Sequence, residues 1–172
     1  MVRIANDPAR FNYLRACARG PVSIVLGDAR LSLAKAPPDQ FDVLLIDAFS
    51  SDSVPVHLLT VEAMRTYLRV IKPDGVVILH LTNRNLELIP PAAAVAAAAG
   101  ASALVQSYRP PDSVPWFLES ASSVLIVART PQALAAFRRD PRWKIADSTQ
   151  ARPWTDDYSN VLGALIGRAT EP

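Results

Sequence analysis

The chain has 172 residues, of which half are hydrophobic and a fifth are charged. This composition is typical of a globular protein and excludes a disordered chain. The 18 Lys and Arg residues exceed the 16 Asp and Glu residues only slightly, for a formal net charge of +2, which is too small an excess to indicate nucleic-acid binding. The length favours a single domain that covers residues 1–172.

Cys17 is the only cysteine, which excludes a disulfide or a cysteine zinc site within one chain. It lies in a helical pattern, where we expect it to act as a small buried hydrophobic residue. The longest apolar stretch, Ala92–Ala99, is far shorter than the roughly 20 residues that span a bilayer. Because the first residues also lack a cationic segment followed by an apolar one, we expect a cytoplasmic protein with no membrane partner.

Strand and helix patterns alternate along the chain. Short apolar runs rich in β-branched residues predict strands, and capping residues, helical spacing and Pro or Gly stops predict helices. The expected strands are Val22–Leu26, Val43–Ile46, Val76–Leu81, Ala103–Val105 and Ser123–Ala128. The expected helices cover roughly Pro8–Ala18, Ala29–Lys35, Val61–Ile71, Pro90–Ala99 and Pro131–Arg138.

This order of elements predicts the fold class. Strands that alternate with helices favour an α/β fold with a mostly parallel sheet and helices on both faces. The last two strands follow each other without a clear helix, which favours an antiparallel hairpin at one edge. The segment 72–75, Lys-Pro-Asp-Gly, predicts a turn in which Gly75 takes a positive φ.

Acidic side chains gather where the central strands end. Asp47 ends an apolar strand, and a serine-rich loop then leads to Asp52. The carboxyl ends of strands in an open α/β sheet are where ligands bind. One acid of such a pair can hold a cationic amine while the other accepts its proton, which suits an amine nucleophile. The alternative is a solvated loop with two ordinary aspartates.

Other polar residues near the strand ends each allow two interpretations. Asp28 follows the first expected strand and either accepts hydrogen bonds from a nucleoside or caps the next helix. Asn83 either contacts substrate or caps the segment after the third strand. His57 and His80 lack the close spacing of metal ligands, so we predict no metal site.

A second group of polar residues lies in the C-terminal part of the chain. Asp156, Asp157 and Tyr158 join two carboxylates to an aromatic hydroxyl. This combination fits an acidic pocket for a polyamine. It fits a helix N-terminus capped by Thr155 equally well.

Taken together, these residues resemble the spermidine synthase (polyamine aminopropyltransferase) family, in particular its spermidine-synthase-like bacterial branch. The likeness extends over about Ile4 to Leu165. It is carried by Gly27-Asp28-Ala29-Arg30, Phe41-Asp42-Val43, Asp47-Ala48-Phe49, the segment Asp52–Thr60, Pro73-Asp74-Gly75 and Thr155-Asp156-Asp157.

The resemblance implies a Rossmann-like S-adenosylmethionine-methyltransferase fold and aminopropyl transfer to a polyamine such as putrescine. Decarboxylated S-adenosylmethionine, or S-adenosylmethionine itself, would be a co-substrate, with no tightly bound cofactor. Asp28 and Ala29 would contact the adenine of this donor, and Asp47 would face its aminopropyl end. Asp52 would be the base for the attacking amine. The remaining substrate-binding candidates are His57, Asn83, Asp156, Asp157 and Tyr158.

The family pattern also includes features that this sequence does not show. Family members have a glycine-rich strand-to-helix turn and a second strand that ends in an acid for the ribose. Without this first βαβ unit, the sheet would have an unpaired edge strand, and we expect a homo-oligomer, most simply a dimer. Two alternative functions stay open: an S-adenosylmethionine-dependent methyltransferase, and a non-catalytic domain that self-associates through the open edge.

Overall fold

The structure is a computed structural model that describes residues 2–49, 55–83, 85–115 and 117–169. Within these residues, the centre of the molecule is a five-stranded sheet in the order β1-β2-β4-β3-β5. Four of the five expected strands are confirmed in position. The strands are β1 (Phe41–Ile46), β2 (Ile71–His80), β3 (Ser102–Tyr108), β4 (Ser122–Ala128) and β5 (Lys144–Ile145).

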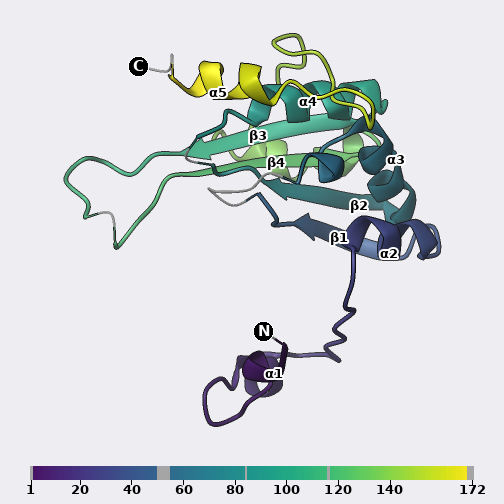
Figure 1. Cartoon of the computed structure of the whole chain (residues 1–172), viewed down its shortest axis with the longest axis vertical. Coiled ribbons are helices and arrows are strands. Elements are labelled where there is room, and N and C mark those ends of the chain that lie inside the picture. The colour runs from purple at the N-terminus through teal and green to yellow at the C-terminus, as the bar shows by residue number, and fades with distance from the viewer. Residues whose placement is uncertain (1, 50–54, 84, 116, 170–172) are drawn as a thin grey trace.

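The α/β fold class is confirmed, but the expected mostly parallel sheet is wrong. Only β1 and β2 pair in parallel, whereas β4 pairs antiparallel with both β2 and β3, and β5 pairs antiparallel with β3. The antiparallel hairpin is therefore not a simple addition at one edge. Its second strand, β4, inserts next to β2 in the middle of the sheet and leaves β3 further out (Figure 1).

Helices lie beside the sheet along most of its length (Figure 1). The predicted α2, α3 and α4 are confirmed. In the C-terminal part, Thr155 forms a β-bridge with Tyr158 instead of capping a helix, and α5 begins only at Val161. The helices are α1 (Val2–Ala5), α2 (Ala29–Lys35), α3 (Val61–Val70), α4 (Ile89–Ala98) and α5 (Val161–Ala169).

Helix α3 shows why the central prediction was correct. The Thr60 hydroxyl caps its first turn by accepting a hydrogen bond from the Ala63 amide at 3.2 Å, and Met64, Tyr67 and Leu68 follow at helical spacing on the buried side. This side packs on the sheet together with Val77 and Leu79 of β2, and α4 extends the same core. Burial of an amphipathic face is the main source of stability for a helix of this length.

The opposite face of the sheet is covered only in part. Val76 of β2 packs there against Ile126 and Leu134, where the chain forms two short 3₁₀ turns, Gln132–Leu134 and Phe137–Arg139. These turns replace the single helix expected over Pro131–Arg138. The cover does not reach β1, whose Val43 and Leu45 lie on this face beside Val76 and Ile78 and remain exposed.

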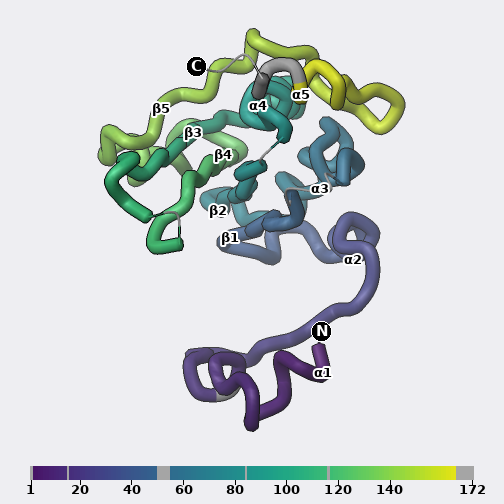
Figure 2. The backbone as a smooth tube through the Cα atoms, turned by 60° about the vertical axis from the view of Figure 1, so that its left-hand side comes forward, coloured from purple at the N-terminus to yellow at the C-terminus, as the bar shows by residue number. Residues whose placement is uncertain are grey.

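Residues 2–27 differ most from expectation. They extend away from the sheet in both views of the molecule (Figures 1 and 2). Instead of a helix over Pro8–Ala18, this segment contains α1 and a single π-type turn, Tyr13–Cys17, and Cys17 is exposed instead of buried. The expected strand Val22–Leu26 is extended but unpaired and exposed, because a buried strand requires neighbours on both sides.

The predicted turn at residues 72–75 is instead an irregularity inside β2. Phe41 aligns with Ile71 and Val43 with Val76, so two steps along β1 correspond to five along β2. Gly75 is needed there for close approach and not for a positive φ, because an added Cβ would lie 2.8 Å from the Phe41 carbonyl oxygen. Gly100, which ends α4, does take a positive φ of 78°.

None of the helices formed by the described residues has the length and apolar character that a membrane crossing requires.

Candidate functional site

The register of β1 and β2 brings Asp47 and His80 together. Ile46 is aligned with Leu79 in this parallel pair, so the next residue on each chain lies at the same sheet edge, where both strands end. His80 Nδ1 lies 2.8 Å from Asp47 Oδ1. Because β1 and β2 are neighbours and run in the same direction, the acid and the imidazole at their ends lie side by side.

A chain of hydrogen bonds continues from this pair. His80 Nε2 lies 2.8 Å from the Thr82 hydroxyl oxygen, and that oxygen accepts a hydrogen bond from the Ser123 amide at 2.9 Å. An ionised carboxylate only accepts, so a neutral His80 carries its proton on Nδ1 and accepts the Thr82 hydroxyl proton on Nε2. The imidazole is thus fixed from both sides, and it in turn fixes the orientation of Asp47.

Asp47 keeps one oxygen available. Its side chain is 63% exposed, and within the described part of the chain only Oδ1 takes part in a hydrogen bond, leaving Oδ2 to solvent. A carboxylate oriented on one side and open on the other can accept hydrogen bonds from an ammonium group. Asp47 is therefore suited to hold a cationic amine at the end of β1.

A second polar cluster lies where α2, α3 and the C-terminal loop meet. Both oxygens of Asp156 accept from Arg30, at 2.8 and 2.6 Å, and Oδ1 also accepts from the Thr60 hydroxyl at 2.8 Å. Arg30 donates further to the His57 carbonyl at 2.9 Å. This bidentate pairing connects α2 to Asp156, which lies 126 positions after Arg30 in the sequence.

Arg30 stabilises the ionised form of Asp156. The hydrogen bonds from Arg30 hold the pKa of the Asp156 carboxyl below its ordinary value, with burial opposing them and Thr60 adding to them. The charge of Asp156 is offset by the Arg30 guanidinium, so Asp156 attracts an approaching cation less than Asp47 does.

A cleft of about 390 Å³ opens beside this cluster. Its lining includes four of the residues proposed from sequence as substrate-binding, namely His57, Asp156, Asp157 and Tyr158. Asp28 lies next to it, with Oδ2 3.7 Å from His57 Nε2, while its Oδ1 accepts from the Leu31 amide and caps α2. Capping and ligand contact, the two interpretations of Asp28, are thus compatible in one side chain.

Two further sequence candidates that the structure describes, Asn83 and Ala29, do not line this cleft. Asn83 is buried, and its side-chain oxygen accepts from the Asn85 and Leu86 amides, each at 2.9 Å, which is the capping alternative. Ala29 is the first residue of α2. Asp52, the candidate base, lies outside the described residues.

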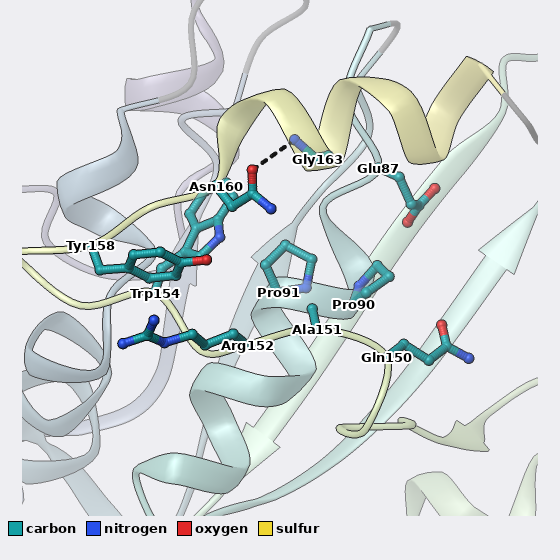
Figure 3. Close-up of a pocket in the computed structure, with 11 residues that line it drawn as sticks. Glu87, Pro90, Pro91, Gln150, Ala151, Arg152, Trp154, Tyr158, Asn160 and Gly163 are labelled. Atoms are coloured by element: carbon teal, nitrogen blue, oxygen red, sulfur yellow. Dashed lines mark hydrogen bonds between the residues drawn. The ribbon is translucent and has the colours of Figure 1, made fainter.

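Tyr158 also borders a second cavity of about 310 Å³ between the start of α4, α5 and the C-terminal loop (Figure 3). The Arg152 guanidinium lies 4.1 Å from the centre of the Tyr158 ring, a cation–π contact. Figure 3 shows Tyr158 and Arg152 on one side of this cavity and Glu87 and Gln150 on the other. Asn160 Oδ1 accepts from the Gly163 amide at 2.9 Å in the first turn of α5.

Two residues of these clusters did not emerge as candidates from the sequence. His80 was set aside because no metal motif surrounds it, and Arg30 contributed only to the family resemblance. The signal for His80 was present, since it ends the strand that follows the Asp47 strand. Arg30 gave no such signal, because its partner Asp156 is distant in sequence. In the described ranges, no group of three or more His, Cys, Asp or Glu residues is placed to hold a metal ion.

The sheet and its helices define a Rossmann-like α/β fold of the methyltransferase type. Among solved structures, the chain is similar to a probable spermidine synthase from Corynebacterium glutamicum, with a TM-score of 0.56, 18% identity and coverage of 83% of this chain. It spans 57% of that protein's length. At this identity the likeness shows a spermidine-synthase-like fold.

Two further structures align more loosely. A spermidine synthase from Thermotoga maritima has a TM-score of 0.47 and 15% identity over 95% of this chain and 52% of its own. MnmC2 from Aquifex aeolicus has a TM-score of 0.47 and 17% identity over 86% of this chain and 43% of its own. No family model matches the sequence, and no curated protein matches it either.

Proposed function

We propose that this chain takes part in the transfer of an aminopropyl group from decarboxylated S-adenosylmethionine to an amine such as putrescine. The observation that carries the proposal is Asp47, held by His80 at the end of β1 with one carboxylate oxygen open to solvent. The likeness of the fold to a probable spermidine synthase supports the same reaction class.

The acceptor requires an anionic site because an alkyl amine is an ammonium ion near pH 7. Asp47 Oδ2 would accept a hydrogen bond from this ammonium and hold it at the sheet edge. His80 would keep the carboxylate turned toward it, since rotation of Asp47 would break the bond to Nδ1. The imidazole acts through Asp47 and is a positioning residue in this proposal.

The reaction itself is a displacement at carbon. The amine loses a proton, its nitrogen attacks the aminopropyl carbon bonded to the sulfonium, and a C–N bond forms as the C–S bond breaks. The bonding pair goes to sulfur, which leaves as a neutral thioether. Asp52 remains the proposed acceptor of the proton. Correct alignment of nitrogen, carbon and sulfur would supply much of the rate enhancement.

The residues around the Arg30–Asp156 pair would bind the adenine end of the donor and the far end of the acceptor amine. Asp28 and Ala29, at the start of α2, would face the adenine of the donor. The cleft lined by His57, Asp157 and Tyr158 has room for the far end of a diamine. Asp156 would contribute mainly by fixing this wall, because its charge is offset by Arg30.

Calorimetric titration tests the proposal. The purified chain is titrated with methylthioadenosine, S-adenosylmethionine and decarboxylated S-adenosylmethionine, and transfer to putrescine is followed by mass spectrometry of the product. We expect the decarboxylated donor to bind more tightly than S-adenosylmethionine, with a product larger by one aminopropyl group. Binding of none of the three nucleosides would overturn the proposal. Preference for S-adenosylmethionine with a methylated product would overturn it in favour of a methyltransferase.

A further inference from the structure

The N-terminal arm, residues 2–27, carries an unpaired strand-like segment. Val22–Leu26 is extended, and in the part of the chain that the structure describes none of residues 21–27 makes a backbone hydrogen bond. Val25 and Leu26 are 74% and 78% exposed, and Val22 and Ile24 are also exposed. A β-branched apolar run of this kind normally pairs with other strands.

The outer edge of β1 is a matching acceptor. β1 is the first strand in the sheet order and pairs only with β2 among the described strands, so its outer N–H and C=O groups are available. Val43 and Leu45 are 55% and 58% exposed on the face that the 3₁₀ turns leave uncovered. An open, apolar edge strand is a template for the addition of another strand.

The anchoring of α2 sets the direction in which the arm can add. Asp28 caps α2, and Arg30 ties its first turn to Asp156 and to the His57 carbonyl, beyond the end of β1. The arm therefore enters α2 at the carboxyl end of the sheet. On its own edge, Val22–Leu26 would run parallel to β1, as in a strand–helix–strand unit, and an exchange that keeps the same contacts between copies keeps this direction.

In the structure the arm does not lie on its own edge. It leaves the body at α2 and extends away from β1 in both views (Figures 1 and 2). Each molecule thus presents a projecting apolar strand and an open apolar edge of similar length. We propose that two copies of this chain associate by exchanging arms, with Val22–Leu26 of each copy added in parallel to β1 of the other.

The exchange satisfies both exposed features at once. Two arm–edge contacts form in one closed dimer, so the β1 edges and the arms of both copies are used. The sheet of each copy gains a strand, and the arm side chains on the same face pack beside Val43 and Leu45. Both elements lie in the same polypeptide, and this inference does not depend on the proposed transferase activity.

Light scattering after size-exclusion chromatography, over a range of concentrations, tests the exchange with two variants. The arm variant is Ile24→Asp/Leu26→Asp and the edge variant is Val43→Lys/Leu45→Lys; all four side chains are exposed, so both variants should fold. We expect a dimer for the wild type and at least a tenfold weaker association for each variant. Ile145→Lys on β5, also exposed, is the matched control and should remain dimeric.

Mixing the two variants gives the decisive result. Each variant alone should associate only weakly, but in the mixture the intact arm of one can pair with the intact edge of the other, so a heterodimer should form. An arm variant that still dimerises would overturn the proposal in favour of edge-to-edge pairing.

A wild-type monomer at all concentrations would also overturn the proposal. Hydrogen exchange at those amides of residues 43–46 that face away from β2 would then separate two cases: protected amides mean that the arm closes on its own edge, and fast exchange means that the edge is left for strands of another polypeptide.

Discussion

Two aspartates of this molecule illustrate opposite uses of the same side chain. Asp156 has both oxygens held by Arg30 and one also by Thr60, whereas Asp47 has one oxygen held by His80 and the other open. The first joins distant parts of the chain, and the second presents a charge to solvent. The difference shows that the hydrogen bonds of a carboxylate, more than its position at a sheet edge, decide whether it is available to a ligand.

The strongest test of this contrast is Asp47→Asn. Loss of the open anionic oxygen should lower the rate of transfer to an amine about 100-fold and abolish the NMR shift changes that putrescine causes around residue 47. The free energy of unfolding should change by less than about 0.5 kcal/mol, because the side chain is exposed. Asp42→Asn, on the same strand but paired with Lys72, is the control. Unchanged putrescine binding in Asp47→Asn would remove Asp47 from the site.

Arg30→Met, unlike Asp47→Asn, should lower the free energy of unfolding clearly. It removes two hydrogen bonds to Asp156 and one to the His57 carbonyl, and we expect a loss of about 1–2 kcal/mol in urea unfolding, allowing for solvent screening at the partly exposed Asp156. Lys72→Ala, which removes an exposed ion pair, should cost at most about 0.5 kcal/mol. Equal costs for the two variants would mean that the Arg30 cluster is not a structural connection.

A smaller effect is expected at His80. His80→Ala should raise the KM for the amine roughly tenfold, about 1.4 kcal/mol, with kcat less affected, because Asp47 loses its orientation but keeps its charge. His80→Gln can still donate to Asp47 and should recover most of this loss. A purely structural role would instead lower the unfolding free energy in both variants without separating their KM values.

The smallest effect concerns pH. Because Arg30 lowers the pKa of folded Asp156, the ionised carboxylate stabilises the fold above the ordinary Asp pKa of about 3.9. This contribution is lost as the pH falls through the lowered value. The stability difference between wild type and Asp156→Asn, measured by urea unfolding, should be constant above roughly pH 5 and shrink below roughly pH 4. A difference that grows on acidification would contradict the assignment.

Local patterns predicted the parts of the fold that are stabilised locally. The Thr60 cap and helical spacing gave α3, and the apolar runs gave β1, β2 and β4. Sequence alone could not place β4 between β2 and β3, because that order depends on pairings between distant residues. Val22–Leu26 has the composition of a buried strand, but composition supplies no partner. The same limit applies to the site: Asp47 follows from its strand end, whereas Arg30 and Asp156 meet only through the tertiary fold.

The additional residues of β2 opposite the start of β1 make the Asp47–His80 pair sensitive to a deletion far from it. They fix the register in which the two strands pair, and Asp47 and His80 meet only in that register. A deletion of one residue within 72–75 would either be absorbed there or shift His80 by one position, which turns its side chain to the other face of the sheet. A deletion in this short segment, at the other end of the strands from Asp47, could therefore disable the site without altering any residue of the site.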